Sequence, residues 1–403
     1  ESDDPGSPAH WIDVSIRIDG ALDTSLLVRG VQETVQRHEL LRTTFRPGAA
    51  SLSQVILDSY VPDVPVLDTA SNGRSGRESE WRDLDTRPPF RAEVVRVSDN
   101  HHVLRLRVHR ILGDGHSMRL LLSEIGGLVA HSMGFDDFPP LDGELQYADY
   151  AAWERSWLTG DTLARRVDHF RREFAVPELP PRLPTDHARS EHAGRDGHQF
   201  AFEFPREVAD AARALAVREQ ASLYTVLLAA FGAAVGNYSQ QRTVAIATPV
   251  TRRNDRATQL MLGSFMNTVP ILIDLDAAAD FPALVGAVKP RVLGALANQD
   301  APWNHVLPAL TALHGPAAHG LGEVGFLMDD PVPGEFAAGG FTLTRVPPER
   351  TIARRELTVA MSTRRGQITG TVTYDGALFD PQSIEHLVTE FIAPLSLSQA
   401  SHA

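Results

Sequence analysis

The chain has 403 residues and a net charge of −13, so it is long enough for two domains of ordinary size and too acidic to favour nucleic-acid binding. It contains no cysteine, which excludes disulfides, thiolate metal sites and thiol nucleophiles. No apolar run approaches the roughly 20 residues of a membrane span and no signal peptide is recognisable, so we expect a soluble cytoplasmic protein.

The first part of the chain alternates predicted strands and helices. A period of two in the apolar residues predicts strands at residues 14–18, 55–57, 92–97 and 102–108. A helix is predicted after the first of these, because Leu27, Val31 and Val35 share one face. A longer helix is predicted to open at Tyr147 and to continue to Phe174.

Residues 109–115, His-Arg-Ile-Leu-Gly-Asp-Gly, connect the predicted strand at 102–108 to a helix that begins near Met118. Gly113 and Gly115 permit the backbone of a tight turn, and Asp114 is a suitable N-cap for the helix. Because such turns commonly present polar side chains to ligands, we expect the functional residues here.

A proline-rich stretch divides the chain. Residues 177–184 contain four prolines and are followed by a polar run over 186–197, which is the composition of a linker. We therefore predict a first lobe over residues 1–176, a linker over 177–197 and a second lobe over 198–403.

The alternation of strands and helices then starts again. Strands are predicted at residues 200–204, 243–248, 269–275, 323–328, 357–362 and 366–374. Helices are predicted at residues 205–219, 222–235, 281–296 and 303–313, and from 381 onward. This order predicts an α/β (α+β) fold of two lobes, each with its own sheet, and a cleft between the lobes is the expected ligand site.

Several ordered strings resemble one family. Residues 37–45 (RHELLRTTF), 147–153 (YADYAAW), 262–268 (LGSFMNT) and 298–303 (NQDAPW) resemble motifs of the condensation domains of non-ribosomal peptide synthetases, and Tyr374 and Phe379 also fall at family positions. The resemblance implies two lobes like chloramphenicol acetyltransferase, arranged as a V with a central cleft. The family's earliest motif is not visible, so we expect sequence to be missing before residue 1.

The signature of that family is HHxxxDG, whose second histidine deprotonates or orients the amine that attacks a carrier-bound thioester. Here that position is Arg110, whereas His109, Asp114 and Gly115 are kept. Arginine stays protonated and has no acceptor lone pair, so it cannot be a general base. The resemblance implies that Asp114 is structural and pairs with Arg253 of the second lobe. We expect Arg110 to project into the channel between the lobes and to face Asp114 or the second lobe.

An arginine at this position resembles the X-domain of glycopeptide-antibiotic synthetases. That resemblance implies a catalytically inactive domain that recruits haem-thiolate cytochrome P-450 oxygenases to a peptide held on the adjacent carrier domain, where they cross-link aromatic side chains. X-domains carry HRxxxDD, and this chain departs from that pattern at Gly115. We expect no cofactor, no metal site and no catalytic residue.

Three alternatives remain open. The chain could be a weakly active condensation domain that works through electrostatic positioning, an epimerisation domain, or a spacer that binds nothing external. Of the nearby polar residues, we interpret His116 as a solvent or packing histidine and Ser117 as a helix cap rather than a nucleophile.

Overall fold

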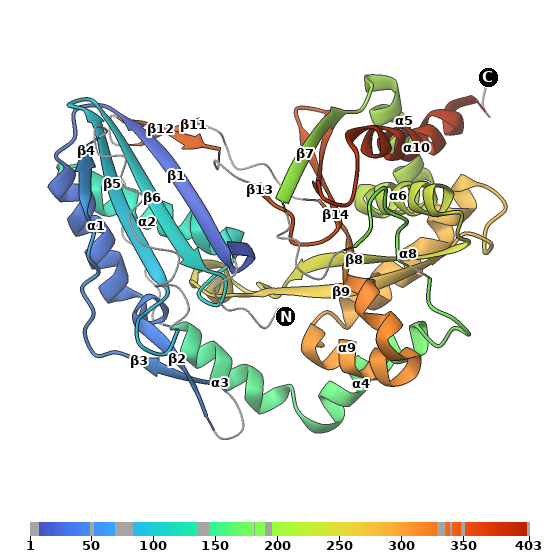
Figure 1. Cartoon of the computed structure of the whole chain (residues 1–403), viewed down its shortest axis with the longest axis horizontal. Coiled ribbons are helices and arrows are strands. Elements are labelled where there is room, and N and C mark those ends of the chain that lie inside the picture. The colour runs from blue at the N-terminus through green and yellow to red at the C-terminus, as the bar shows by residue number, and fades with distance from the viewer. Residues whose placement is uncertain are drawn as a thin grey trace. The chain divides into compact units, whose positions relative to one another are not determined.

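The computed structural model describes residues 8–48, 52–68, 84–135, 145–180, 182–189, 196–328, 335–338, 341–347 and 351–400. The chain forms two compact units, each with its own mixed sheet (Figure 1). The first unit comprises Glu1–Trp157, Arg253–Phe265 and Val332–Glu349, and the second comprises Leu158–Arg252, Met266–Pro331 and Arg350–Ala403. The α/β class is therefore as predicted.

Among the described residues of the first unit, six strands form the sheet. Their order is β11 (Glu335–Ala338), β12 (Phe341–Val346), β1 (Trp11–Asp19), β6 (His101–His109), β5 (Phe90–Ser98) and β4 (Val66–Asp68). Helices α1 (Thr24–Arg37) and α2 (Gly115–Ser132) share one hydrophobic core with this sheet. The core contains Val31, Leu106 and Leu121, which are almost fully buried.

Smaller elements complete the first unit. These are η1 (Pro8–His10), η2 (Glu39–Arg42), the two-stranded ribbon β2 (Thr43–Pro47) and β3 (Leu52–Ile56), α3 (Tyr147–Trp157) and α7 (Arg256–Leu260). Tyr147 and Tyr150 of α3 pack on Phe265, with ring centroids 5.3 and 4.7 Å from that ring.

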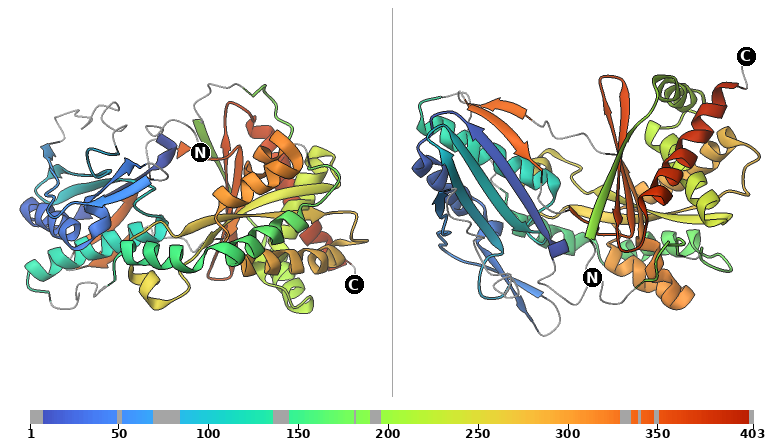
Figure 2. Two further views of the ribbon diagram at one scale, coloured as in Figure 1. Left: turned by 90° about the horizontal axis from the view of Figure 1, so that it is seen from below. Right: turned by 45° about the horizontal axis from the view of Figure 1, so that its top comes forward.

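Seven strands of the described chain form the mixed sheet of the second unit, and Figure 2 gives two further views of the ribbon. Their order is β13 (Thr351–Ile352), β7 (Asp196–Glu203), β15 (Gln367–Asp375), β14 (Leu357–Arg364), β10 (Val324–Met328), β8 (Thr243–Thr251) and β9 (Met266–Asp274). The helices of this unit are α4 (Gly160–Glu173), α5 (Arg206–Arg218), α6 (Leu223–Ser239), α8 (Phe281–Ala297), α9 (Trp303–His314), η4 (Gly315–Gly322) and α10 (Pro381–Ala400). No single helix in the described part of the chain is long and apolar enough to cross a membrane.

The division into units corrects the predicted boundaries. The first stretch of the first unit ends at Trp157 rather than at residue 176. Two later segments of the chain, Arg253–Phe265 and Val332–Glu349, also belong to this unit. One of them holds β12, which pairs antiparallel with β1, with Arg345 opposite Ile16. A boundary read from one proline-rich stretch misses such returns because strand pairing joins residues that are far apart in sequence.

The described part of the predicted linker, residues 177–180, 182–189 and 196–197, belongs to the second unit, and residues 181 and 190–195 lie outside the described residues. Leu179 and Leu183 are buried in its core, and Arg182 and Arg189 both pair with the buried carboxylate of Glu356. Residues 179–189, as far as they are described, are held by two buried leucines and two ion pairs, so they are part of the fold and not a flexible connection.

The helix predicted from Tyr147 to Phe174 is two helices. α3 ends at Trp157 and α4 begins at Gly160. Gly160 has a φ of +50°, a left-handed conformation that interrupts an α-helix and that glycine adopts without a steric penalty.

Candidate functional site

The turn at residues 109–115 follows a strand that is paired on both sides. β6 is hydrogen-bonded to β1 and to β5, and Trp11 of β1 lies opposite His109. The backbone N–H of Arg110 donates to the carbonyl of His10 (2.8 Å). The turn is therefore anchored to η1 and β1, so the side chains it carries are presented from a rigid platform.

Asp114 caps α2 and forms a buried ion pair. Its Oδ1 accepts from the backbone N–H of Ser117 (2.8 Å) and lies 3.2 Å from Nη2 of Arg253. Burial acts to raise the pKa of Asp114, but the charge of Arg253 and hydrogen bonds from Ser117 and Arg253 outweigh it and lower that pKa. Burial lowers the pKa of Arg253 against the opposing charge of Asp114. The two residues lie together as the sequence analysis expected, but Arg253 belongs to the first unit and not to the second.

Ser117 is the centre of this buried cluster. Its hydroxyl lies 2.8 Å from the carbonyl of Gly263 and 3.0 Å from Oδ1 of Asp114, and it accepts from Nη2 of Arg253 (2.8 Å) and from the N–H of Gly263 (3.1 Å). Ser117 is fully buried. It was predicted to cap the helix, but the cap is Asp114, and Ser117 supplies the capped N–H.

The two glycines of the turn differ in whether a larger residue could replace them. Neither of them is among the residues with positive φ, so neither needs the left-handed backbone conformation that glycine adopts most readily. A Cβ on Gly113 would lie 2.8 Å from Cβ of Ser117, whereas one on Gly115 would meet nothing within 4 Å. Gly113 is needed for close approach to Ser117, and Gly115 is not sterically required.

His109 is buried and neutral. Its Nδ1 accepts from the backbone N–H of Ile111 (3.2 Å), so the ring proton lies on Nε2. Nε2 has no hydrogen-bond partner among the described residues. The ring of Trp11 packs edge-on against the imidazole, with the two ring centroids 5.0 Å apart. Burial, with smaller effects from the charges of His10 and Arg110, lowers the pKa of His109 to about 4. The single lone pair of His109 is therefore engaged in a hydrogen bond, and the ring is a weak base at neutral pH.

Arg110 contacts the chain before β1. Its Nε donates to the carbonyl of Ala9 (3.2 Å). The two Asp114 oxygens bond to Ser117, Arg253 and the N–H of Phe265, and the expectation that Arg110 projects into the channel and faces Asp114 or the second lobe stays a prediction. The role of residues 9–11 could not be predicted from the sequence, because no motif marks them and only the β1–β6 pairing brings them to the turn.

His116, the nearest other candidate base, uses both ring nitrogens. Nε2 lies 2.8 Å from the carbonyl of Gln259 and Nδ1 lies 3.2 Å from Nη2 of Arg119. Since a carbonyl only accepts and a guanidinium only donates, Nε2 carries the proton and the lone pair of Nδ1 is occupied. This geometry agrees with the prediction of a packing histidine.

The other motif strings are also structural. In the string at residues 37–45, Arg37 and His38 both pair with the buried carboxylate of Glu124 on α2. In the string at 262–268, the Asn267 side chain donates to the carbonyls of Gln299 and Ala301 (2.7 Å each) and so holds the string at 298–303. Tyr374 and Phe379 are buried in the core of the second unit.

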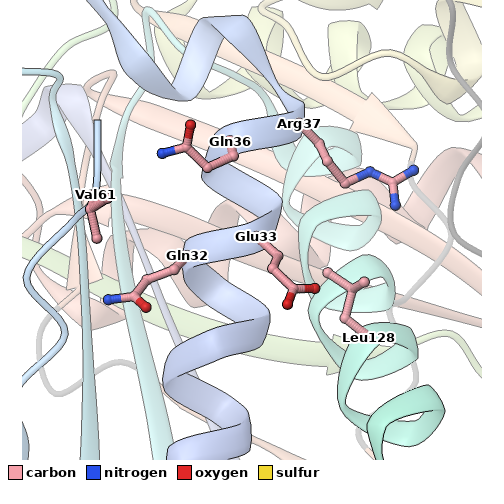
Figure 3. Close-up of a pocket in the computed structure, with 6 residues that line it drawn as sticks. All are labelled: Gln32, Glu33, Gln36, Arg37, Val61 and Leu128. Carbon is pink, nitrogen blue, oxygen red and sulfur yellow. The ribbon is translucent and has the colours of Figure 1, made fainter. Parts of the chain in front are cut away.

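A shallow groove lies elsewhere in the first unit. It has a volume of about 350 Å³ and is lined by Gln32, Glu33, Gln36 and Arg37 of α1 with Val61 and Leu128 (Figure 3). No residue of the 109–117 turn lines it, so it is separate from the motif. Among the described residues, no group of three or more potential ligands could hold a metal ion.

Comparison with known sequences identifies long relatives. One protein of the linear gramicidin synthase of Brevibacillus parabrevis is 28% identical over 401 residues, which cover 96% of this chain and 5% of that protein. Phosphinothricin tripeptide synthetase PhsC of Streptomyces viridochromogenes is 30% identical over 422 residues, covering 99% of this chain and 38% of that protein. The chain thus spans a small part of these relatives.

Solved structures share the fold. The X-domain from teicoplanin biosynthesis superposes with a TM-score of 0.85 at 24% identity, covering 98% of this chain and 91% of that one. The complex of that X-domain and OxyB has a TM-score of 0.84 at 24% identity, covering 99% of this chain and 90% of that one. The epimerization domain from the third module of tyrocidine synthetase B has a TM-score of 0.73 at 18% identity, covering 98% of this chain and 92% of that one. Residues 2–399 match the family model described as Condensation domain, and the chain therefore belongs to the condensation-domain family.

Proposed function

We propose that this chain is a catalytically inactive condensation-like domain, an X-domain, which recruits cytochrome P-450 oxygenases to a peptide held on the adjacent carrier domain of a glycopeptide-antibiotic synthetase. One observation carries the proposal. Arg110 occupies the position of the family's proton acceptor, and the retained His109 already uses its single lone pair on the N–H of Ile111.

The chemistry of the turn supports this proposal. General-base catalysis needs an acceptor within hydrogen-bond reach of the attacking amine, with a pKa near the working pH. The guanidinium of Arg110 has no lone pair. His109, with a pKa of about 4, is too weak a base at neutral pH. His116 and Asp114 have their acceptor atoms engaged within the fold.

The retained residues fit a domain selected for its fold. The Asp114–Arg253–Ser117 cluster is buried and intact, so loss of the base has not been followed by loss of the scaffold. The teicoplanin X-domain has the same fold and has been solved in a complex with OxyB, which supports an oxygenase as the partner. The long relatives support a carrier domain in cis.

The direct test is binding to an oxygenase. The purified chain is titrated by calorimetry with each cytochrome P-450 encoded beside the synthetase gene, and the mixture is run on gel filtration. We expect a one-to-one complex with at least one of them. A condensation domain of the same synthetase that keeps both histidines is the matched control, and it is expected not to bind. If no pathway oxygenase forms a complex with the chain, the recruitment proposal fails.

A second candidate function is slow condensation or epimerisation of carrier-bound peptides. It is favoured by the retention of His109, Asp114 and the whole fold, and by relatives that are peptide synthetases. It predicts a product that disappears in a His109→Ala variant. The third alternative, a spacer, predicts that deletion of the domain leaves oxidation of the carrier-bound peptide unchanged.

A further inference from the structure

The ring of His109 is contacted by the residues that lead into β1. Ala9 and His10 belong to η1, and Trp11 is the first residue of β1. The ring of Trp11 packs edge-on against the imidazole of His109, with the centroids 5.0 Å apart, and the centroid of the His10 ring lies 5.8 Å from that imidazole. Only 8% of His109 is exposed. We call residues 9–11 the strap, because they lie against this ring.

Two hydrogen bonds join the strap to Arg110. The backbone N–H of Arg110 donates to the carbonyl of His10 (2.8 Å), and Nε of its side chain donates to the carbonyl of Ala9 (3.2 Å). The first bond needs only a backbone N–H, which every residue except proline has. The second bond needs a side-chain donor, so it depends on which residue occupies position 110.

Trp11 is also held by a cation. The Cζ atom of Arg107 lies 5.4 Å from the centroid of the Trp11 ring, a distance at which a guanidinium is attracted to the face of an aromatic ring. Nε of Arg107 lies 3.3 Å from Oδ1 of Asp13 on β1. Arg107 and the pairing of β1 with β6 thus hold Trp11, and the bonds to Arg110 hold the other two residues of the strap.

We propose that the strap keeps water and ligands away from His109 and that the side chain of Arg110 is the positioning residue that fastens it. Nε2 of His109 carries a proton and is buried without a hydrogen-bond partner among the described residues. Such an unpaired donor favours opening of the strap, because water would then satisfy it. The bond from Nε of Arg110 to Ala9 acts against opening. The inference goes beyond the proposed function, since it concerns access to His109 and involves no oxygenase.

Hydrogen exchange at Cε1 of the imidazole rings, followed by mass spectrometry of the purified chain, tests the inference. This carbon-bound hydrogen exchanges slowly and only where water reaches the ring, so each histidine reports its own access to solvent. His131, which is exposed on α2, is the reference for an open ring. His102, which is 1% exposed and lies on the same strand as His109, reports opening of the whole unit.

Two variants of similar side-chain length separate the hydrogen bond from the charge. Arg110→Gln places an amide nitrogen at the position of Nε and keeps a donor, whereas Arg110→Met has no donor. In the wild type we expect His109 to exchange at least about tenfold more slowly than His131. Arg110→Met is expected to accelerate exchange at His109 by about three- to tenfold, as the loss of one hydrogen bond implies, and Arg110→Gln is expected to keep it slow. Arg17→Met, the same substitution at an exposed position of β1, is the control and is expected to have no effect on His109.

Three results would overturn the inference. Equal rates at His109 and His131 in the wild type mean that the ring is not covered. No acceleration in Arg110→Met, or equal acceleration in Arg110→Gln and Arg110→Met, means that the hydrogen bond of Arg110 does not fasten the strap. Equal acceleration of His102 and His109 means that the whole unit opens rather than the strap. If Arg110→Met does not fold, Arg110→Ala, which also lacks the donor, takes its place.

Discussion

The backbone N–H of Ile111 donates to Nδ1 of His109 across a distance of 3.2 Å. This bond fixes the neutral tautomer with the proton on Nε2, and Nε2 lies in a buried position beside Trp11. The retained histidine of the signature therefore acts as a part of the fold. The residue after it, Arg110, carries a permanent charge and has no acceptor lone pair, and His109, with a pKa of about 4, is a weak base at neutral pH.

The buried neutral state of His109 makes stability dependent on pH. Its pKa in the folded protein is about 4, below the ordinary 6.5. The unfolded chain therefore binds a proton at higher pH than the folded chain does, and stability falls as the pH drops from about 6.5 towards 4. From this group alone we expect a loss of about 2 kcal/mol between about pH 7 and pH 5. Urea unfolding of the wild type and of His109→Gln at both pH values measures it.

A matched control separates this effect from general acid sensitivity. His131→Gln, at an exposed position of α2, is expected to keep the wild-type pH dependence. If His109→Gln loses as much stability on acidification as the wild type does, the neutral buried histidine is not the cause.

The Asp114–Arg253 pair is expected to stabilise the first unit strongly and non-additively. Asp114→Asn or Arg253→Met alone leaves one buried partner uncompensated, which costs about 3–5 kcal/mol. The double variant is expected to cost clearly less than the sum of the two, because it leaves no isolated charge. Chemical unfolding of the four proteins gives the coupling energy. The surface pair Arg17–Asp19, at 3.0 Å, is the control, with an expected coupling of at most about 1 kcal/mol. Additive costs at Asp114 and Arg253 would contradict the account.

The two glycines of the turn are expected to respond in opposite directions. Gly113→Ala places a Cβ 2.8 Å from Cβ of Ser117, and such overpacking costs about 1–3 kcal/mol. Gly115→Ala meets open space and removes a poor helix former from the first turn of α2, so it is expected to be neutral or to stabilise by up to about 1 kcal/mol. Thermal unfolding distinguishes the two variants, and equal losses would mean that the contact with Ser117 does not determine the choice of glycine.

Restoring the family's histidine is not expected to restore full activity. Arg110→His loses the hydrogen bond from Nε to the carbonyl of Ala9, which costs about 0.5–1.5 kcal/mol. The neighbouring His109 keeps its bond to Ile111 and remains without a free lone pair. We expect condensation by Arg110→His to stay well below that of a domain with both histidines, as measured by mass spectrometry of the carrier-bound product. Full activity in this variant would mean that Arg110 alone accounts for the loss of condensation activity.

The turn between β6 and α2 could be predicted from the sequence because its signals are local. The apolar period changes from strand to helix on either side of it, and Asp114 has the chemistry of a cap. The prediction of one helix over 147–174 was wrong because the helix is interrupted before Gly160. The pair Thr159-Gly160 is a sequence signal for such a break. The helical patterns of the residues on both sides of this pair outweighed that signal in the prediction.

Long-range pairing could not be predicted in this way. The apolar period of residues 341–346 does not predict that this strand pairs with β1. The composition of residues 177–184 does not predict that Arg182 and Arg189 pair with Glu356. The role of Ser117 was also hidden, since its contacts with Arg253 and Gly263 depend on a chain segment far along the sequence. The resemblance to a family suggested the pairing of Asp114 with Arg253, which spacing alone does not reveal.

The central claim is that a chain with Arg110 at the proton-acceptor position does not form peptide bonds. The most direct measurement incubates the wild-type chain with a peptide-loaded donor carrier and an amino acid-loaded acceptor carrier, and follows the acceptor by mass spectrometry. A condensation domain that keeps both histidines is run in parallel. We expect the acceptor to show no extended peptide above the background measured without protein, whereas the parallel domain forms the product. Extended peptide formed by the wild-type chain at a rate comparable to that domain would contradict it.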